Sequence, residues 1–260
     1  MGSPLFFVSA VIPVYNGEAF LSEAVESIRQ RGYRPLEIII LEDGSTDNTK
    51  RIARGLNGDV HYIYRPNSGL PAARNRGLQI SQGNVIGFLD VDDLWRRDKL
   101  ECQLAHLNEA SSADIVIGYT RILMLMDIVE GKHIFKKWAD PIFALSVGSA
   151  LFRRSVFETV GCFDEARRYC DDWDWFMRAR ECGVTMLVHT EVTQFYRRHV
   201  RNMTNQEKLG NHYFTKMLKK SVDRRREKTC SPAESLLRLS RVAEEFAGKR
   251  SDTSERQTKD

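Results

Sequence analysis

Four nearly continuous apolar runs, each followed by a polar loop and then by helical periodicity, constrain the fold of this chain most. They occupy residues 8–15, 36–41, 60–64 and 84–89. Short apolar runs without alternation are typical of strands that are covered on both faces. Strands that alternate with helices at this spacing predict a mostly parallel sheet with right-handed crossovers. We therefore expect an α/β, Rossmann-like fold with helices flanking the sheet.

The pattern changes near residue 114, where strand-like runs follow one another without long helices between them. These runs are "DIVIGY" (114–119), "RILMLMDIV" (121–129), "VGSALFRR" (147–154), "VTMLVH" (184–189) and "VTQFYRR" (192–198). A helix is expected over 172–182, ended by Gly183. The second half of the chain is therefore predicted to be smaller and of mixed strand direction.

Beyond Asn205 the chain becomes basic and helical. Seven basic residues lie between Lys216 and Lys228, and a capping box from Ser231 to Glu234 begins an amphipathic pattern. Residues 248–260 are polar and are expected to be disordered. Basic and amphipathic helices can hold a protein on an anionic membrane. Because the apolar face is short, we expect weak peripheral membrane association at most, and favour folding of this helix against the rest of the chain.

Bulk composition excludes several classes of protein. The net charge of +4 over 260 residues gives no argument for nucleic acid as a partner. None of the five cysteines forms a CxxC pair, so the sequence shows neither a zinc motif nor a redox motif. An odd number of scattered cysteines indicates free thiols in a reducing compartment. No secretory signal or membrane-spanning run is recognisable. We therefore expect a cytoplasmic protein, with the inner face of the membrane as the alternative location.

The segment "GFLDVDDLW" carries three carboxylates in four positions, Asp90, Asp92 and Asp93. A solvated loop that caps the helix begun by Asp98 is the simplest interpretation. A calcium loop is excluded, because Trp95 stands where glycine is needed. The third interpretation is a Mg²⁺ or Mn²⁺ site completed by substrate phosphates, since hard cations prefer oxygen ligands.

Six segments decide among these interpretations, because together they resemble the family 2 glycosyltransferases, nucleotide-sugar enzymes of GT-A fold. In chain order they are "VIPVYN" (11–16), "EDGSTDNT" (42–49), "NSGLPAARNRGL" (67–78), "FLDVDD" (88–93), "GCFDE" (161–165) and "DDWDWFMR" (171–178). The resemblance covers residues 8–200. It implies a nucleotide-sugar-binding half over 1–113 and an acceptor-side half over 114–205, followed by a helical extension over 206–247 and the tail over 248–260.

The resemblance also implies roles for individual residues in donor binding. Pro13, Tyr15 and Asp43 would hold the nucleoside, with Asp43 accepting the uracil N3–H. Glu42 departs from the aspartate that is common in the family at its position. An Asx-type turn is the alternative role of Asp43.

The diphosphate and metal would be met by a second group of residues. Arg74 would face the nucleotide, and its alternative is a surface helix position. Asp90 would meet the ribose or a metal-bound water, and Asp92 would ligate Mn²⁺ or Mg²⁺ on the diphosphate. His199 would approach the metal, and Arg197 or Arg198 would lie near a phosphate. Asp93 is expected to have a structural role.

The "DDWDW" segment would supply the acceptor side. The resemblance assigns the role of catalytic base to Asp172, with Asp171 and Asp174 as alternatives. In the structural interpretation, all three aspartates only cap the N-terminus of the helix. Trp173 could stack on a sugar, although one of Trp173 and Trp175 should be core.

The resemblance implies an inverting glycosyltransferase, which moves a sugar from a nucleotide-diphosphate sugar to a hydroxyl acceptor. A UDP-sugar is the favoured donor. The acceptor would be a glycan or a lipid-linked molecule, in cell-surface glycan synthesis. The alternatives are a nucleotidyltransferase and a non-catalytic nucleotide-sugar-binding module. The first would need a glycine- and lysine-rich phosphate loop, which "PVYNGEAF" lacks.

Overall fold

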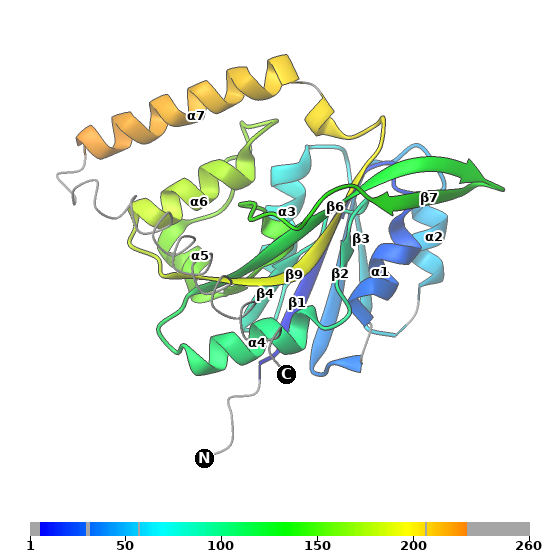
Figure 1. The fold of residues 1–260 in the computed structure, drawn as a ribbon, viewed down its shortest axis with the longest axis horizontal. Coiled ribbons are helices and arrows are strands. Elements are labelled where there is room, and N and C mark those ends of the chain that lie inside the picture. Colours follow the sequence, from blue (N-terminus) through cyan, green and yellow to red (C-terminus); the bar gives the residue numbers. More distant parts are fainter. Residues whose placement is uncertain (1–5, 30–31, 57, 206, 228–260) are drawn as a thin grey trace, which may run out of the picture.

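A single sheet organises the molecule. The computed structural model describes residues 6–29, 32–56, 58–205 and 207–227. Among them the strands join in the order β3-β2-β1-β4-β8-β6-β9-β5, and β7 pairs with β6 outside this path. Helices pack on both faces, as Figure 1 shows. The α/β class predicted from the sequence is confirmed.

The N-terminal part of the sheet is parallel. β1 (Val8–Val14) pairs with β2 (Leu36–Asp43) on one side and with β4 (Val85–Phe88) on the other, and β3 (Val60–Arg65) extends the sheet beyond β2. The crossovers are made by α1 (Leu21–Arg29), α2 (Thr49–Gly55) and α3 (Leu70–Ile80). The carboxyl ends of β1, β2 and β4 consequently meet at one edge, which is where ligands bind in open α/β sheets.

The second part of the sheet is mixed, and its strands are longer than expected. The two runs at 114–119 and 121–129 form one strand, β6 (Ile115–Val129), and the runs at 184–189 and 192–198 form β9 (Met186–Arg198). These strands are parallel to one another, and their register shifts between Ile117 and Thr120. The polar residues that suggested strand ends therefore lie at irregularities within continuous strands.

Shorter strands and turns complete this part. β5 (Leu94–Trp95) pairs antiparallel with β9, β7 (Lys132–Lys137) pairs with β6, and β8 (Ala150–Arg153) lies antiparallel between β4 and β6. Two 3₁₀ turns cover Val147–Ser149 and Met203–Asn205. Because β5 follows directly after the three clustered aspartates, its pairing with β9 anchors the segment that carries them.

The remaining helices are α4 (Lys99–Glu109), α5 (Ser155–Val160), α6 (Asp171–Glu181) and α7 (Glu207–Glu227). The expected helix over 172–182 corresponds to α6. Asp98 does occupy the N-cap position of α4, but the expected side-chain cap is wrong. Its carboxylate accepts a hydrogen bond from Arg96 instead, at 2.7 Å, and this charged partner outcompetes the backbone N–H groups.

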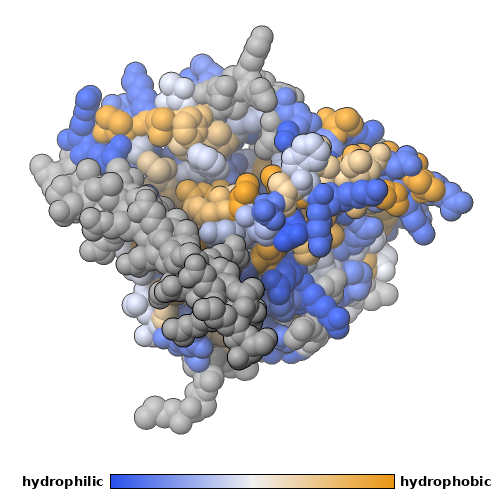
Figure 2. Space-filling view, viewed as in Figure 1, coloured by the Kyte–Doolittle hydropathy of each residue, from blue (hydrophilic) through white to orange (hydrophobic). Residues whose placement is uncertain are grey.

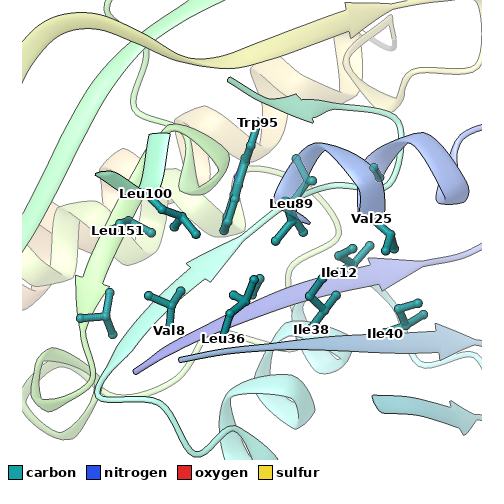
Figure 3. Packing of buried hydrophobic residues seen from close by; sticks show 14 of the residues in the cluster. Val8, Ile12, Val25, Leu36, Ile38, Ile40, Leu89, Trp95, Leu100 and Leu151 are labelled. Carbon is teal, nitrogen blue, oxygen red and sulfur yellow. The ribbon is translucent and has the colours of Figure 1, made fainter. Parts of the chain in front are cut away.

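The core fills both faces of the sheet. Val8, Ile12 and Ile38 pack with Leu89 and Trp95 on the face covered by α1 and α4, as Figure 3 shows. On the opposite face Val11, Ile39 and Phe88 belong to a second cluster, which includes residues of α3, α5 and α6. Neighbouring residues of one strand thus enter different cores, which explains why the N-terminal strands read as unbroken apolar runs.

The basic helix α7 lies against α6 (Figure 1). Ser221 and Arg224 both bond to Glu181 at the end of α6, at 2.5 and 2.7 Å, and Lys220 pairs with Asp164 at 3.2 Å. Part of the basic charge is therefore used within the protein. The expectations for residues 228–260, including the capping box and the amphipathic face, fall outside the described residues. None of the helices described in the structure has the length and apolarity that crossing a bilayer requires.

Candidate active site at the carboxyl edge of the sheet

Each of the three clustered aspartates has its own partner. We call residues 90–93, which follow β4, the acidic loop. Asp90 accepts a hydrogen bond from Nη2 of Arg74 at 2.7 Å, and its side chain is 37% exposed. Burial raises the pKa of Asp90 above its ordinary value. The charge of Arg74 lowers this pKa, and the charge of Asp92 raises it, but burial has the largest effect. Asp90 therefore faces both an arginine and a second carboxylate.

Asp92 is partnered by residues from the other end of the chain. Its Oδ2 lies 3.1 Å from Nε2 of His199 and accepts a hydrogen bond from Nδ2 of Asn202 at 3.0 Å. The His199 ring stacks on Phe20 at a centroid distance of 5.0 Å, which fixes its orientation. The structure thus brings together Asp92 and His199, the two residues predicted to approach the metal. Asn202 was not predicted, although it lies in the same "RRHVRN" segment.

Asp93 is a buried structural residue. Its carboxylate accepts hydrogen bonds from the Gln194 amide at 2.6 Å and from the backbone N–H of Arg197 at 2.9 Å. Burial, and then the charges of Asp92 and Asp90, hold its pKa well above the ordinary value. The acidic loop is therefore fixed to β9, and the structural interpretation of Asp93 fits these contacts.

Arg197 is buried and contacts the acidic loop, instead of being exposed to solvent. Its side chain is 2% exposed, lies 4.8 Å from the Phe20 ring centroid and donates to the backbone carbonyl of Asp92 and to Glu23. The neighbouring Arg198 is exposed. Of the two arginines considered for phosphate, only Arg198 is freely accessible to solvent.

Arg74 links the acidic loop to α6. It is buried, and its Nη1 donates to Oδ2 of Asp171 at 2.5 Å while Nη2 meets Asp90. Burial would lower the pKa of Arg74, but Asp90 and Asp171 raise it, so the guanidinium stays charged. The surface-helix alternative for Arg74 is therefore wrong, whereas Arg76 of the same helix is exposed.

The start of α6 presents a second group of three aspartates at positions 171, 172 and 174. Asp172 accepts a hydrogen bond from the N–H of Trp173, at 2.8 Å, and among the residues that the structure describes no arginine forms an ion pair with it. Burial and then the neighbouring Asp171 raise the pKa of Asp172 to about 7, against the lowering effect of Arg74. A carboxylate in this range can accept a proton near neutral pH.

The other acidic and aromatic residues of α6 have structural partners. Asp174 is 1% exposed and contacts Arg167 and Arg178, both at 3.1 Å. Trp175 is fully buried, as expected for one of the two tryptophans. Trp173 is 43% exposed and packs edge-on against Phe214 of α7 at 5.5 Å. Only Asp172 of the three aspartates therefore has a carboxylate available to a substrate.

The residues expected at the nucleoside lie at the same edge of the sheet. Pro13 is buried within β1, while Tyr15 just beyond it is 51% exposed. Asp43 is buried, and its carboxylate accepts hydrogen bonds from the N–H groups of Ser68, at 3.0 Å, and Gly69, at 2.8 Å. Its carboxylate caps the loop before α3, rather than the Asx-type turn that was the alternative. Glu42 is likewise engaged, by Ser45 and Tyr62.

The donor set of the acidic loop fits a hard divalent cation. Burial raises the pKa of Asp90 most and the charge of Asp92 raises it further, and a cation at the loop would offset the repulsion between the two carboxylates. Carboxylate oxygens together with one imidazole nitrogen suit Mn²⁺, and carboxylates with phosphate oxygens suit Mg²⁺. Asp92 and His199 are the residues that would hold it.

Comparisons with known proteins show which family the chain resembles. Residues 9–161 match the family model described as glycosyl transferase family 2. An uncharacterized glycosyltransferase of Rickettsia typhi is 34% identical over 195 residues, covering 70% of this chain and 61% of the relative. A putative teichuronic acid biosynthesis glycosyltransferase of Bacillus subtilis, TuaG, is 38% identical over 124 residues, covering 46% of this chain and 48% of the relative. The chain thus spans about half to three fifths of these two relatives.

Solved structures show the same fold. Residues 1–349 of S. aureus TarS, crystallised with UDP-GlcNAc, superpose with a TM-score of 0.63 at 19% identity, covering 76% of this chain and 60% of that one. At this identity the likeness shows the fold alone, which is GT-A. Since the family model matches more than half of the 260 residues, the chain belongs to glycosyl transferase family 2.

Proposed function

We propose that this protein is an inverting glycosyltransferase that moves a sugar from a nucleotide-diphosphate sugar to a hydroxyl acceptor. The observation that carries the proposal is Arg74, which bonds Asp90 of the acidic loop and Asp171 of α6 at once. One buried guanidinium thereby sets the distance between the proposed donor-binding loop and the proposed base, Asp172. Support for UDP as the nucleotide comes from the TarS complex, and support for a cell-surface glycan comes from TuaG.

The donor would lie across the carboxyl ends of β1, β2 and β4. Tyr15 has its ring exposed at the end of β1 and is proposed to contact the base, with Pro13 setting the direction of the chain. Asp43 would shape the base pocket by fixing Ser68 and Gly69, and a bound uracil would compete with these contacts for its carboxylate. Asp90 is proposed to face the ribose.

Asp92 and His199 would hold Mn²⁺ or Mg²⁺, whose charge offsets the negative charge that develops on the departing diphosphate. Hydrogen bonds that hold the acidic loop in place support this assignment. Asn202 and His199 orient Asp92, Arg197 fixes its backbone carbonyl, and Asp93 ties the loop to β9. The exposed Arg198 is proposed to stabilise a phosphate.

Asp172 is proposed to accept the proton of the acceptor hydroxyl. As the hydroxyl oxygen bonds to the anomeric carbon, the bond from that carbon to the diphosphate breaks on the opposite face. A single displacement inverts the carbon and requires no covalent sugar–enzyme intermediate. Asp171 is held by Arg74 and so serves to position this segment, and the exposed part of Trp173 offers an apolar face to a sugar ring.

Turnover of labelled UDP-sugars tests this function. The protein is incubated with each UDP-sugar, with and without Mn²⁺, in the presence of candidate acceptors, and released UDP and glycosylated product are measured. We expect product only with an acceptor hydroxyl and a divalent cation. Binding without UDP release would indicate a non-catalytic module, whereas release of diphosphate from a nucleoside triphosphate would indicate a nucleotidyltransferase.

A thermal-shift screen identifies the nucleotide. UDP, GDP and dTDP are compared at equal concentration with Mn²⁺, because a ligand that binds only the folded state raises its stability by mass action. We expect UDP to give the largest shift. A larger shift with GDP would contradict the assignment of UDP while leaving the transfer reaction in place.

A further inference from the structure

A second group of potential metal ligands lies apart from the acidic loop. It consists of Cys102 and His106 on α4 and His189 and Glu191 on β9, whose ligand atoms all lie within 4.8 Å of one another. Asp90 and Asp92 of the acidic loop, and His199 beside Asp92, are not part of it. The two residues of α4 are separated by four positions and so lie on one face of the helix. No CxxC pair marks this group in the sequence, so its four residues come together only in the folded chain.

A distortion of β9 brings its two members to α4. Ile117 and Tyr119 of β6 pair with Val188 and Val192 of β9, so three residues of β9 stand opposite one residue of β6. The extra residues contain His189 and Glu191. Gly118 lies opposite them, where a Cβ atom would come within 2.8 Å of Cε1 of His189. Bulges are frequent next to functional sites because they redirect side chains.

Hydrogen bonds decide which of the four residues can ligate a metal. Nδ1 of His189 lies 2.6 Å from Oε2 of Glu191, and its Nε2 lies 3.3 Å from Nε2 of Gln103. The Gln103 amide nitrogen donates to the carbonyls of Val116 and Ser149, at 3.1 and 2.9 Å. A proton on Nε2 of His189 would therefore face another donor. The ring proton belongs on Nδ1, where it is donated to Glu191.

We propose that Cys102, His106 and Glu191 bind one Zn²⁺ ion, and that His189 positions Glu191 through its Nδ1–H group. Thiolate, imidazole and carboxylate are all zinc ligands, and three protein ligands leave a fourth position for water. One thiolate and one carboxylate balance the charge of the ion. Binding releases the Cys102 thiol proton to solvent.

The packing around the cluster agrees with a site for one small ion. His189 is 4% exposed, and its ring stacks on His106 at a centroid distance of 4.7 Å. The nearby Lys99 is fully buried, and its ammonium donates to Oε1 of Gln103 at 2.6 Å and to the carbonyl of Ala150 at 3.3 Å, so its hydrogen bonds are made outside the four cluster residues.

Zinc binding is measured by competition with a fluorescent chelator, using metal-free full-length protein in an Asp92→Asn background, so that the acidic loop does not contribute. We expect one ion per chain. Cys102→Ser, His106→Gln and Glu191→Gln should each weaken binding by more than about 100-fold, whereas His189→Gln should weaken it by about 10–100-fold, as is usual for outer-shell partners. Cys182→Ser is the matched control, since Cys182 is an exposed free thiol outside the cluster.

Cobalt gives a second, spectroscopic readout, which reports whether a thiolate is among the ligands. Co²⁺ bound to the wild-type protein should show a thiolate-to-cobalt charge-transfer band, which Cys102→Ser abolishes and Cys182→Ser retains. Absence of stoichiometric Zn²⁺ binding, or equal binding by Cys102→Ser, would overturn the site. Loss at His189→Gln as large as at the three ligands, in a variant whose circular dichroism is unchanged, would overturn the assignment of His189 as a positioning residue.

Discussion

Two segments of this protein each carry three aspartates in four positions, and they differ in how the charge is balanced. In the acidic loop the buried Asp93 is held by neutral donors, an amide and a backbone N–H. At the start of α6 the buried Asp174 is held by Arg167 and Arg178. In both segments one aspartate bonds to Arg74, and the third, Asp92 or Asp172, is partly exposed.

The difference lies in that third carboxylate. Asp92 contacts a histidine and an amide rather than an arginine, and both contacts orient its carboxylate, so it suits a cation. Asp172 accepts a hydrogen bond from the N–H of Trp173 instead. Burial, and then the charge of Asp171, raise the pKa of Asp172 to about 7, so it suits proton transfer. The same residue type and spacing can thus serve two kinds of chemistry, because the surrounding side chains determine the protonation state.

The largest effect is expected from Asp92→Asn. Removal of one of the proposed metal ligands should abolish Mn²⁺-dependent turnover of UDP-sugar while circular dichroism and unfolding temperature stay near those of the wild type. Asp127→Asn, at an exposed aspartate on β6, is the matched control. Full activity of Asp92→Asn in Mn²⁺ would show that Asp92 is not the ligand.

Asp172→Asn should separate chemistry from binding. We expect kcat to fall by about 10²–10⁴-fold, the usual range for a positioned base, while donor affinity measured by calorimetry stays near normal. A parallel loss of donor affinity would place Asp172 in the nucleotide site and remove the contrast between the two segments.

Arg74→Met should disturb both segments, since it leaves Asp171 buried without its cation. Breaking a buried ion pair from one side costs about 3–5 kcal/mol of unfolding free energy, and the more exposed Asp90 adds less. Urea denaturation measures this, with Arg76→Met as the exposed control in the same helix. The double variant Arg74→Met/Asp171→Asn should regain part of the loss; if it is no more stable than Arg74→Met alone, the pair does not act as described.

The pH dependence of kcat sharpens the assignment of Asp172. Because a general base acts in its ionised form, kcat should rise about tenfold per pH unit below about 7 and become constant above it. A profile that is flat from pH 5 to 8 would exclude Asp172 as a base with a raised pKa.

The smallest effect concerns stability. The pKa of Asp172 is higher in the folded protein than its ordinary value of 3.8, so the folded state binds more protons and loses stability as the pH rises from about 4 to 7. Asp172→Asn should therefore unfold at a higher temperature than the wild type at pH 8, and the two should converge near pH 4. A lower unfolding temperature at pH 8 would contradict this.

The fold could be predicted where local pattern and burial coincide. β1 and β2 enter two cores at once, so their unbroken apolar runs identified them, and the strand–helix alternation predicted parallel pairing. β6 and β9 were divided wrongly, because polar residues within them resemble strand ends. A bulge is a cooperative property of two paired strands, and a single stretch of sequence does not reveal it.

The site was predictable in its residue types but not in its connections. The segment "FLDVDD" indicated a carboxylate cluster, yet the contacts of Asp93 to Gln194 and Arg197 join residues more than a hundred positions apart. The burial of Asp43 against Ser68 and Gly69 was missed for the same reason. Hydrogen-bond partners depend on the packing of whole elements, and the sequence near each residue does not encode them.

The Arg74 bridge also has a consequence for the order in which this protein forms during synthesis. Asp90 leaves the ribosome 16 residues after Arg74, whereas Asp171 follows Arg74 by 97 residues. At the usual rate of about 5–20 residues per second, the second interval lasts roughly 5–20 s. During that time the nascent chain can form the Arg74–Asp90 pair but not the Arg74–Asp171 pair, so the part that would bind the donor can assemble before the part that would activate the acceptor.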